Sequence, residues 1–286
     1  MLASGDSITP MKISVAARLV HIVLDPFLIF GWWIFPRMEI SGAALASVIS
    51  QTLGMLMGLR ILLTGRSRIK LTLKNFHLDV DVIWRMVKIG LPALISGVQR
   101  NLSQFILMWF MVPFGTIAVA AHSINQRIEM IVMMPAMAFG MASGVLMGQN
   151  LGRSQDERAK KSTWLAVGLV QVIMLIISVV ILLWAESIVS IFSTEPDLVQ
   201  LASTFLRINV ASVMFMSLMF VLMNSLTGAG DTVPPMIISV VTAWGVMLPL
   251  AYFLPKIDGF GMLGIRWAIV SQMVVGAIAF VIYFPS

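Results

Sequence analysis

The chain of 286 residues contains no cysteine, and only 11% of its residues are charged. Without cysteine, the chain has no means of forming a disulfide scaffold or a cysteine-ligated metal site. A soluble domain carries roughly 25% charged residues, so this chain lacks the polar surface that a water-exposed globule needs. These absences exclude a soluble enzyme and a disulfide-rich domain, and the high apolar content excludes a disordered chain.

Apolar residues, in contrast, make up 59% of the chain and raise its mean hydropathy to +0.96. They come in blocks of about 20 residues, the length of an α-helix that crosses a bilayer. Backbone groups in lipid must be paired internally, so these blocks predict helices. The pattern predicts an all-α integral membrane protein with about eight transmembrane helices, at 12–34, 40–63, 87–112, 117–147, 162–184, 199–226, 234–254 and 261–284.

The distribution of basic residues predicts the orientation. More than half of the 19 Lys and Arg residues lie in the segment 60–88 and the loop 153–161, which two predicted spans separate. The positive-inside rule places both in the cytoplasm. We therefore predict a multi-pass protein of the plasma (inner) membrane with both termini in the cytoplasm. These loops account for the net charge of +6, and we expect no nucleic-acid partner.

An internal repeat predicts how the chain is organised. Residues 5–15 and 230–240 are identical at seven of eleven positions, and each begins with a Gly-Asp-Ser/Thr turn before a helix. Both copies start on the same predicted side, so the repeat is parallel. At this offset, a repeat that begins near residue 87 implies roughly 140 residues upstream of Met1. A genuine eight-helix protein with a duplicated hairpin is the alternative.

On this interpretation the chain is N-terminally truncated and has three parts. Residues 1–64 form the last two helices of a first six-helix lobe, and residues 87–286 form a complete second lobe. Residues 65–86 alternate basic and apolar side chains, which predicts a cytoplasmic linker that ends in a short amphipathic helix on the membrane face.

Several stretches resemble the multidrug and toxic compound extrusion (MATE) family. They are the Gly5-Asp-Ser turn with Pro10, His21-Ile-Val-Leu-Asp-Pro26, Gly42-Ala-Ala-Leu-Ala46, Gly90-Leu-Pro-Ala93, Gly115-Thr-Ile-Ala-Val-Ala-Ala-His122, Gly148-Gln-Asn-Leu-Gly152 and Asn224-Ser-Leu-Thr-Gly-Ala-Gly-Asp231. The resemblance implies twelve helices in two lobes and the export of bulky, usually cationic, amphipathic compounds by alternating access. The exchange partner is inward H⁺ or Na⁺, and no enzyme activity or other cofactor is expected.

Two other functions stay open: a lipid-linked saccharide flippase of the same superfamily, and a non-transporting helical membrane scaffold. Lipid and a small cationic amphipath are the expected partners, and the full-length protein is expected to be a monomer. No spacing typical of a metal site occurs in the sequence.

The first predicted helix carries Arg18, His21 and Asp25 on one face. Ionisable residues inside a span are costly and are functional candidates by default. Pro26 leaves a carbonyl unpaired beside Asp25, so this carboxylate could take a proton or a small cation, with His21 biasing the balance. The resemblance implies the same role for Asp25, although the family commonly has Asn at the position of His21. A structural Arg18–Asp25 or His21–Asp25 pair is the alternative.

Further polar residues inside predicted spans are candidates for lining a cavity or for pairing between helices: Gln99, Arg100, Gln104, Asn125, Arg127, Glu129 and Arg207. Arg100 is expected to pair with a carboxylate such as Glu129, and Arg266 to extend to the outer interface. The resemblance implies a second ion site with acidic residues at the positions of Arg100 and Met216. Both acids are missing here, so ion coupling is expected at Asp25.

Two periodic features concern packing. Gly140, Gly144, Gly148 and Gly152 recur every four residues, which predicts a close helix–helix contact. The chain also has 23 methionines, five of which (Met130, Met133, Met134, Met137 and Met141) lie in one predicted helix. Flexible methionine side chains are suited to a cavity that accepts varied ligands, but they are also ordinary lipid-facing residues.

Overall fold

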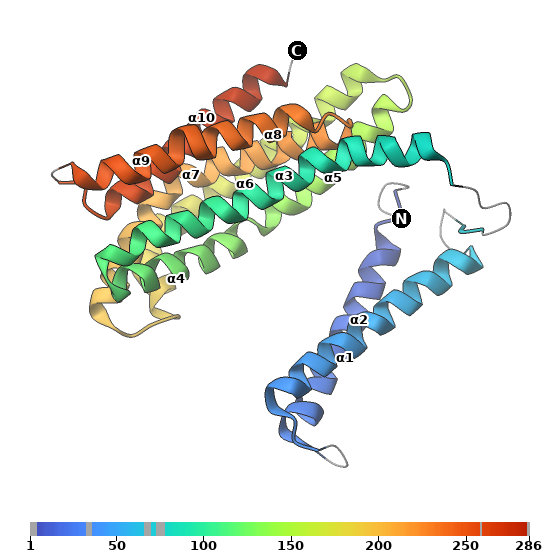
Figure 1. Ribbon diagram of the computed structural model, residues 1–286, viewed down its shortest axis with the longest axis horizontal. Coiled ribbons are helices and arrows are strands. Elements are labelled where there is room, and N and C mark those ends of the chain that lie inside the picture. The colour runs from blue at the N-terminus through green and yellow to red at the C-terminus, as the bar shows by residue number, and fades with distance from the viewer. Residues whose placement is uncertain (1–4, 33–35, 66–69, 73–77, 258, 285–286) are drawn as a thin grey trace. The chain divides into compact units, whose positions relative to one another are not determined.

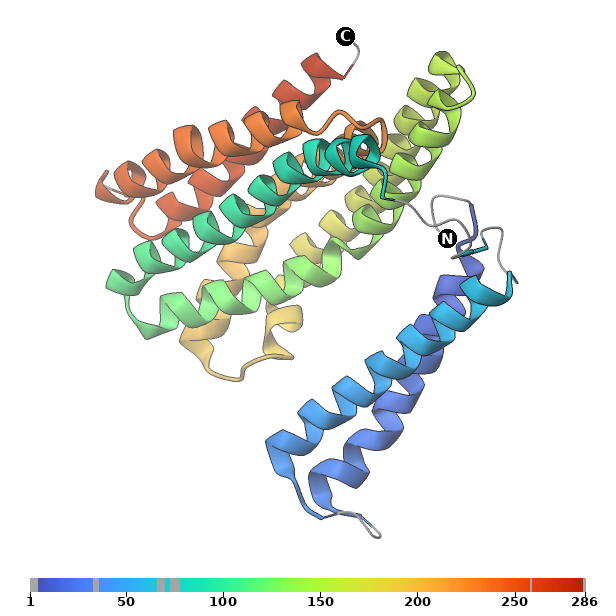
Figure 2. The ribbon, with the colours of Figure 1, turned by 45° about the vertical axis from the view of Figure 1, so that its right-hand side comes forward.

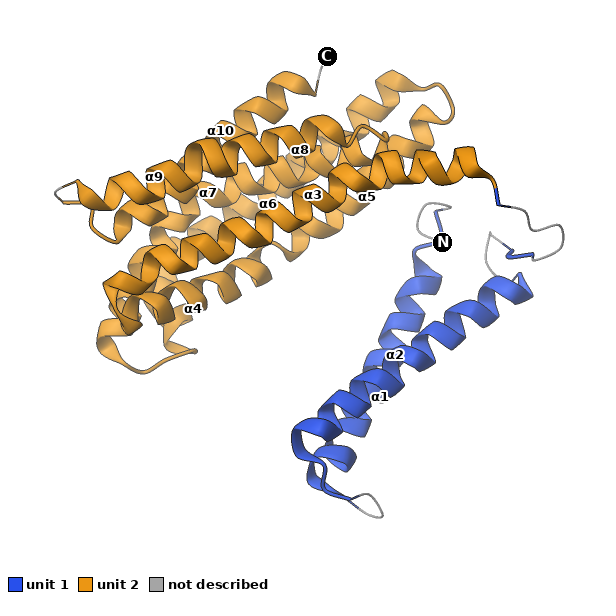
Figure 3. Ribbon diagram, in the orientation of Figure 1, with its two compact units in different colours: residues 1–78 blue, residues 79–286 orange. Residues whose placement is uncertain are grey.

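The computed structural model describes residues 5–32, 36–65, 70–72, 78–257 and 259–284, and nearly all of these are helical (Figure 1). This architecture confirms the predicted all-α membrane class. The helices divide into two compact units, residues 1–78 (unit 1) and residues 79–286 (unit 2), as Figure 3 shows.

Unit 1 is a helical hairpin in which α1 (Ile8–Phe30) and α2 (Glu39–Thr64) lie side by side (Figure 1). Helix α1 continues through Pro26 and ends at Gly31, which adopts the left-handed conformation, with φ of +70°, that glycine tolerates best. Gly42 of α2 lies directly against the carbonyl of Leu28, where a Cβ atom would overlap the backbone. The glycine therefore allows the two helices to approach closely at this end of the hairpin.

Figure 2 shows the helices of unit 2 gathered in a bundle. One helix of this bundle packs against four others. The elements of unit 2 are α3 (Val80–Met111), η2 (Val112–Phe114), α4 (Thr116–Val132), α5 (Met134–Leu151), α6 (Asp156–Ser190), α7 (Pro196–Gly228), α8 (Val233–Val240), η3 (Val241–Met247), α9 (Leu248–Phe253), η4 (Leu254–Lys256) and α10 (Leu263–Tyr283). Helix α7 packs against α4, α5, α6 and α10, and buried residues occur along its whole length.

The predicted span 117–147 is wrong as a single helix. It consists of α4 and α5, which meet at Met133 and are bent by 45° relative to one another. The residue that causes the break is Pro135, the second residue of α5, because proline has no N–H to donate to the carbonyl four residues earlier.

The boundary between the predicted linker and the third span also needs correction. Helix α3 begins at Val80 and continues to Met111, so residues 80–86 belong to it and do not form a separate amphipathic helix. The helix starts early because the Asp79 carboxylate accepts hydrogen bonds from the backbone N–H groups of Asp81 (3.0 Å) and Val82 (3.2 Å). Residues 66–69 and 73–77 of the predicted linker lie outside the described residues.

Replacement of this N-cap is expected to weaken the start of α3. Asp79→Ala removes the acceptor for two N–H groups and should destabilise the protein by about 1 kcal/mol. Thermal unfolding of the detergent-solubilised protein measures the change, and Asp79→Asn, which keeps an acceptor oxygen, is the matched control. Equal stability of the alanine variant and the wild type would show that the cap contributes nothing.

The long helix 233–256 contains an irregular segment. Residues Val241–Met247 form a π-helix, which directly precedes Pro249 near the start of α9. Because Pro249 lacks an N–H group, the helix cannot keep its regular hydrogen-bond pattern at this point. Such π-helical turns are rare and occur often at functional sites.

The two copies of the sequence repeat have the same local structure. Gly5 and Gly230 both have positive φ, of 78° and 85°. In each copy the helix opens with the same backbone hydrogen bond of 3.3 Å, from Met11 to Ser7 and from Met236 to Thr232. Gly264 also repeats the role of Gly42, since it lies against the backbone where the preceding helix ends, at Leu254. The interpretation of the three segments as parts of two lobes remains a prediction.

Within the described residues, six helices are long and apolar enough to cross a membrane, or seven if the bent pair α4 and α5 forms one span. The predicted third span, 87–112, is not among these helices, because α3 does not meet the criterion of length and apolar composition. Its central turns carry a polar run, Gln99, Arg100, Asn101, Ser103 and Gln104, which lowers its hydropathy. A helix of this composition is poorly suited to face lipid on all sides.

Candidate functional site

Asp25 lies five residues before Phe30, the last residue of α1, and one turn after His21. Its Oδ1 atom is 3.7 Å from His21 Nε2, is buried, and has no hydrogen-bond partner among the described residues. Arg18 is exposed, and no ion pair joins it to Asp25 in the described part of the chain. The carboxylate is therefore not neutralised by a neighbouring guanidinium.

His21 connects the two helices of unit 1. Its Nε2 atom lies 2.9 Å from Ser47 Oγ of α2, within hydrogen-bond distance. This contact with Ser47 fixes the imidazole ring beside Asp25. His21 and Asp25 both belong to α1, so the contact between these two side chains does not itself join two helices. A buried, unpartnered carboxylate oxygen next to an anchored imidazole can accept a proton or contribute a ligand to a small cation.

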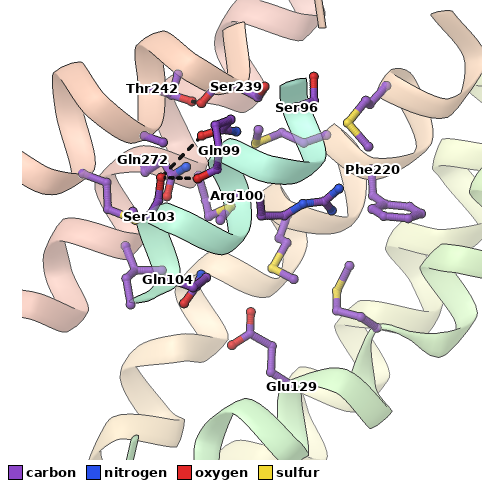
Figure 4. Close-up of a pocket in the computed structure, with 18 of the residues that line it drawn as sticks. Ser96, Gln99, Arg100, Ser103, Gln104, Glu129, Phe220, Ser239, Thr242 and Gln272 are labelled. Carbon is purple, nitrogen blue, oxygen red and sulfur yellow. Dashed lines mark hydrogen bonds between the residues drawn. The ribbon is translucent and has the colours of Figure 1, made fainter. Parts of the chain in front are cut away.

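Unit 2 contains a pocket of about 490 Å³ bounded by α3, α4, α5, α7, α8, η3 and α10. Figure 4 shows its polar wall on α3, with Phe220 of α7 across from it. Four predicted residues line it: Gln99, Arg100, Gln104 and Glu129. Four of the five residues of the polar run in α3, Gln99, Arg100, Ser103 and Gln104, thus line this pocket.

Hydrogen bonds hold several of these side chains in place. Gln126 donates to Gln104 Oε1 over 3.2 Å and joins α4 to α3. Ser103 donates to the Gln99 carbonyl over 2.7 Å (Figure 4). Asn209 of α7 donates to Glu129 Oε2 over 3.2 Å.

The expected Arg100–Glu129 ion pair does not occur among the described residues. Arg100 is exposed to the pocket, and Glu129 is held by Asn209 instead. Figure 4 shows the Arg100 side chain pointing away from the Glu129 carboxylate.

The remaining candidates have other surroundings. Asn125 is buried and donates to the carbonyls of Ala121 and Ala202, both at 3.0 Å, so it joins α4 to α7. Arg207 forms a 3.1 Å ion pair with Glu186 at an exposed position, and Arg127 is exposed outside the described lining of the pocket.

Arg266 is the pocket residue that sequence reasoning placed wrongly. Instead of extending to the outer interface, it is 2% exposed, and its Cζ atom lies 4.4 Å from the centre of the Phe205 ring. The rule that an ionisable residue inside a span is a functional candidate would have found it, since α10 has no other charged residue. Its position near the start of α10 suggested an interfacial role, but the packing of α7 against α10 buries it.

Eight methionines line the pocket, from α4, α5, α7, η3, α10 and the break between α4 and α5. Of the five methionines noted in the sequence, Met130, Met133 and Met137 are among them, whereas Met134 and Met141 are exposed elsewhere. Met137 lines the pocket although Met134 and Met141 of the same helix do not, so the break at Met133 does not separate the two groups. Polarizable, flexible side chains give the pocket walls that adapt to varied apolar groups.

The four glycines of α5 have two kinds of surroundings. Gly140, Gly144 and Gly148 face α7, where a Cβ atom at Gly144 would lie 2.6 Å from the Asn224 carbonyl oxygen. Gly228 of α7 completes the contact, because a Cβ atom there would overlap the Gly144 backbone. Gly152 lies just beyond α5 and meets only its own helix turn among the described residues.

Among the described residues, no group of three or more His, Cys, Asp or Glu side chains could share a metal ion. The geometry thus offers two features: in unit 1, a carboxylate with one oxygen that has no hydrogen-bond partner among the described residues, beside an anchored histidine, and in unit 2, a methionine-rich pocket with charged side chains.

Long apolar helices with ionisable side chains turned inward define the chain as part of a multi-pass membrane protein. The family model MatE matches residues 92–253, more than half of the chain. The chain belongs to the MATE family of efflux transporters.

Curated relatives and solved structures agree with this assignment. The chain is 27% identical to the probable multidrug resistance protein YoeA of Bacillus subtilis over 92% of this chain and 57% of that protein. It is 26% identical to the FAD transporter of Shewanella oneidensis over 90% of this chain and 57% of that protein. The crystal structure of the Vibrio cholerae MATE transporter VcmN in the bent form superposes with a TM-score of 0.85 and 21% identity, covering 98% of this chain and 62% of that one. The chain therefore spans less than two thirds of the length of these relatives.

Proposed function

We propose that the protein is a secondary active exporter that moves bulky cationic, amphipathic drugs or metabolites outward in exchange for H⁺ or Na⁺ by alternating access. It acts as a monomer in the plasma membrane, with both ends of the 286-residue sequence in the cytoplasm. The observation that carries the coupling role is the buried Asp25 Oδ1 atom without a hydrogen-bond partner among the described residues.

The argument for coupling is energetic. A carboxylate inside a membrane-spanning helix is costly unless it is paired, and Asp25 lacks a guanidinium partner in the described part of the chain. A proton or Na⁺ bound at this oxygen removes that cost. An ion can shift the equilibrium between inward-open and outward-open states only by binding one of them more tightly, so Asp25 must have different surroundings in the two states.

The substrate class is supported by the pocket of unit 2 and by the relatives. Its methionine walls suit apolar groups of varied shape, and the Glu129 carboxylate opens into it (Figure 4). The names of the relatives cover both a multidrug resistance protein and an FAD transporter, which supports drugs or metabolites as cargo.

Ethidium efflux from proteoliposomes tests this function. With the full-length protein, efflux should occur when a pH gradient or a Na⁺ gradient is imposed separately, and should stop when that gradient is dissipated. The gradient that drives efflux identifies the coupling ion. Efflux that continues with neither gradient, or that requires ATP, would contradict secondary active antiport.

A further inference from the structure

Arg266 is a buried cation, and two of its three nitrogen atoms are buried without a hydrogen-bond partner among the described residues. It is 2% exposed, and neither Nε nor Nη2 has a hydrogen-bond partner among the described residues. A guanidinium has five N–H donors and stays charged in proteins, so leaving it buried and unsatisfied is unfavourable. The face of the Phe205 ring stabilises the charge through a cation–π contact but accepts no in-plane hydrogen bond.

The pocket itself does not supply the missing acceptor. The Glu129 carboxylate lines the same pocket, but no ion pair joins it to Arg266 among the described residues, and Asn209 donates to its Oε2. Arg100 adds a second guanidinium to the lining. The described lining therefore carries two positive charges and one negative charge, a net charge of +1 with His122 neutral.

An oxyanion on a bound molecule would satisfy this arrangement. Guanidinium groups bind carboxylates through two parallel charge-assisted hydrogen bonds, and a site shielded from water strengthens such bonds. The methionines of α5 and α7, such as Met137, Met219 and Met223, provide apolar surface for the rest of the molecule. The Glu129 carboxylate is available for a cationic group.

We propose that Arg266 forms a carboxylate subsite in the unit 2 pocket, which selects amphipathic substrates carrying a carboxylate as well as a cationic group. The inference rests on the proposed export function and specifies its substrate class. Zwitterionic amphipaths are then bound in preference to otherwise identical compounds whose carboxylate is esterified.

The test uses two dyes that differ at one group, rhodamine 110 with a free carboxylate and its methyl ester rhodamine 123. Fluorescence polarisation measures their binding to the purified full-length protein without any ion gradient. The wild type should bind the acid at least about tenfold more tightly than the ester, as expected for a charge-assisted bond. Equal binding of the two dyes, or binding of neither, would overturn the proposal.

Variants locate the effect at Arg266. Arg266→Gln should weaken binding of the acid by about tenfold or more and leave that of the ester within about threefold. Arg266→Met is a second variant in case the first does not fold, because replacing a buried charge by an apolar side chain of similar size is often tolerated. Arg207→Gln, which alters an exposed arginine paired with Glu186, should change neither affinity. An equal loss for both dyes in a folded Arg266 variant would show a merely structural role.

Ethidium efflux measured with the same preparation separates this inference from the proposed function. Gradient-driven efflux without any preference for the acid would refute the subsite while leaving the exporter intact. A preference for the acid without gradient-driven efflux would support the subsite and refute coupled export.

Discussion

Proteoliposomes containing the Asp25→Asn variant are expected to lose gradient-driven ethidium efflux entirely. Asparagine has nearly the same shape as aspartate and can keep its place beside His21, but it neither takes up a proton nor carries the charge that attracts Na⁺. The equilibrium between the two states then no longer depends on the ion. Efflux rates under an imposed pH or Na⁺ gradient, compared with protein-free liposomes, measure the loss.

Two controls show whether the defect lies in coupling. Ethidium binding by the purified variant should match that of the wild type, since the residues that line the unit 2 pocket are unchanged. Asp197→Asn, which neutralises an exposed carboxylate at the start of α7, should leave efflux unchanged. Wild-type efflux by Asp25→Asn would refute the coupling role, as would an equal loss in both variants.

A single methyl group at Gly228 is expected to destabilise unit 2 markedly. The Cβ atom of Gly228→Ala would overlap the backbone of Gly144, and a backbone segment cannot move aside as a flexible side chain can. Helices α5 and α7 must then separate, at a cost of about 1–3 kcal/mol for overpacking. A lower thermal unfolding temperature and a smaller yield of monodisperse protein in detergent are the expected measurements.

Gly168→Ala is the matched control for this substitution. Gly168 lies in α6, where no atom of the described residues comes within 4 Å of the position of a Cβ atom, so alanine there should stabilise the helix by about 0.5–1 kcal/mol. The two variants thus carry the same chemical change and should shift the unfolding temperature in opposite directions. If Gly228→Ala were as stable as the wild type, the close contact between α5 and α7 would not contribute to stability.

Much of the fold follows from the sequence, because apolar blocks of membrane-spanning length leave few alternatives to helices. The repeated turns at Gly5 and Gly230 were also recognisable, since positive φ angles favour glycine and the following residues are nearly the same. Helix boundaries were less accurate. The break at Met133 follows from Pro135, and the early start of α3 follows from the Asp79 cap.

The candidate site was predictable where it depends on spacing within one helix. His21 and Asp25 are one turn apart in any helix, so their proximity needed no knowledge of the fold. The pairings between helices were not predictable in the same way. Arg100 was expected to pair with Glu129, but Asn209 of α7 donates a hydrogen bond to Glu129 instead.

The sequence by itself determined that this chain spans a membrane in helices, that it carries a repeated segment, and that Asp25 lies beside His21. These properties depend on composition and on helical periodicity, which are local. Only the tertiary structure decided that Arg266 is buried against Phe205, that Arg207 pairs with Glu186, and that the polar face of α3 borders a pocket. Such contacts join helices far apart in the chain, and they depend on how α7 packs among its neighbours, which no local pattern specifies.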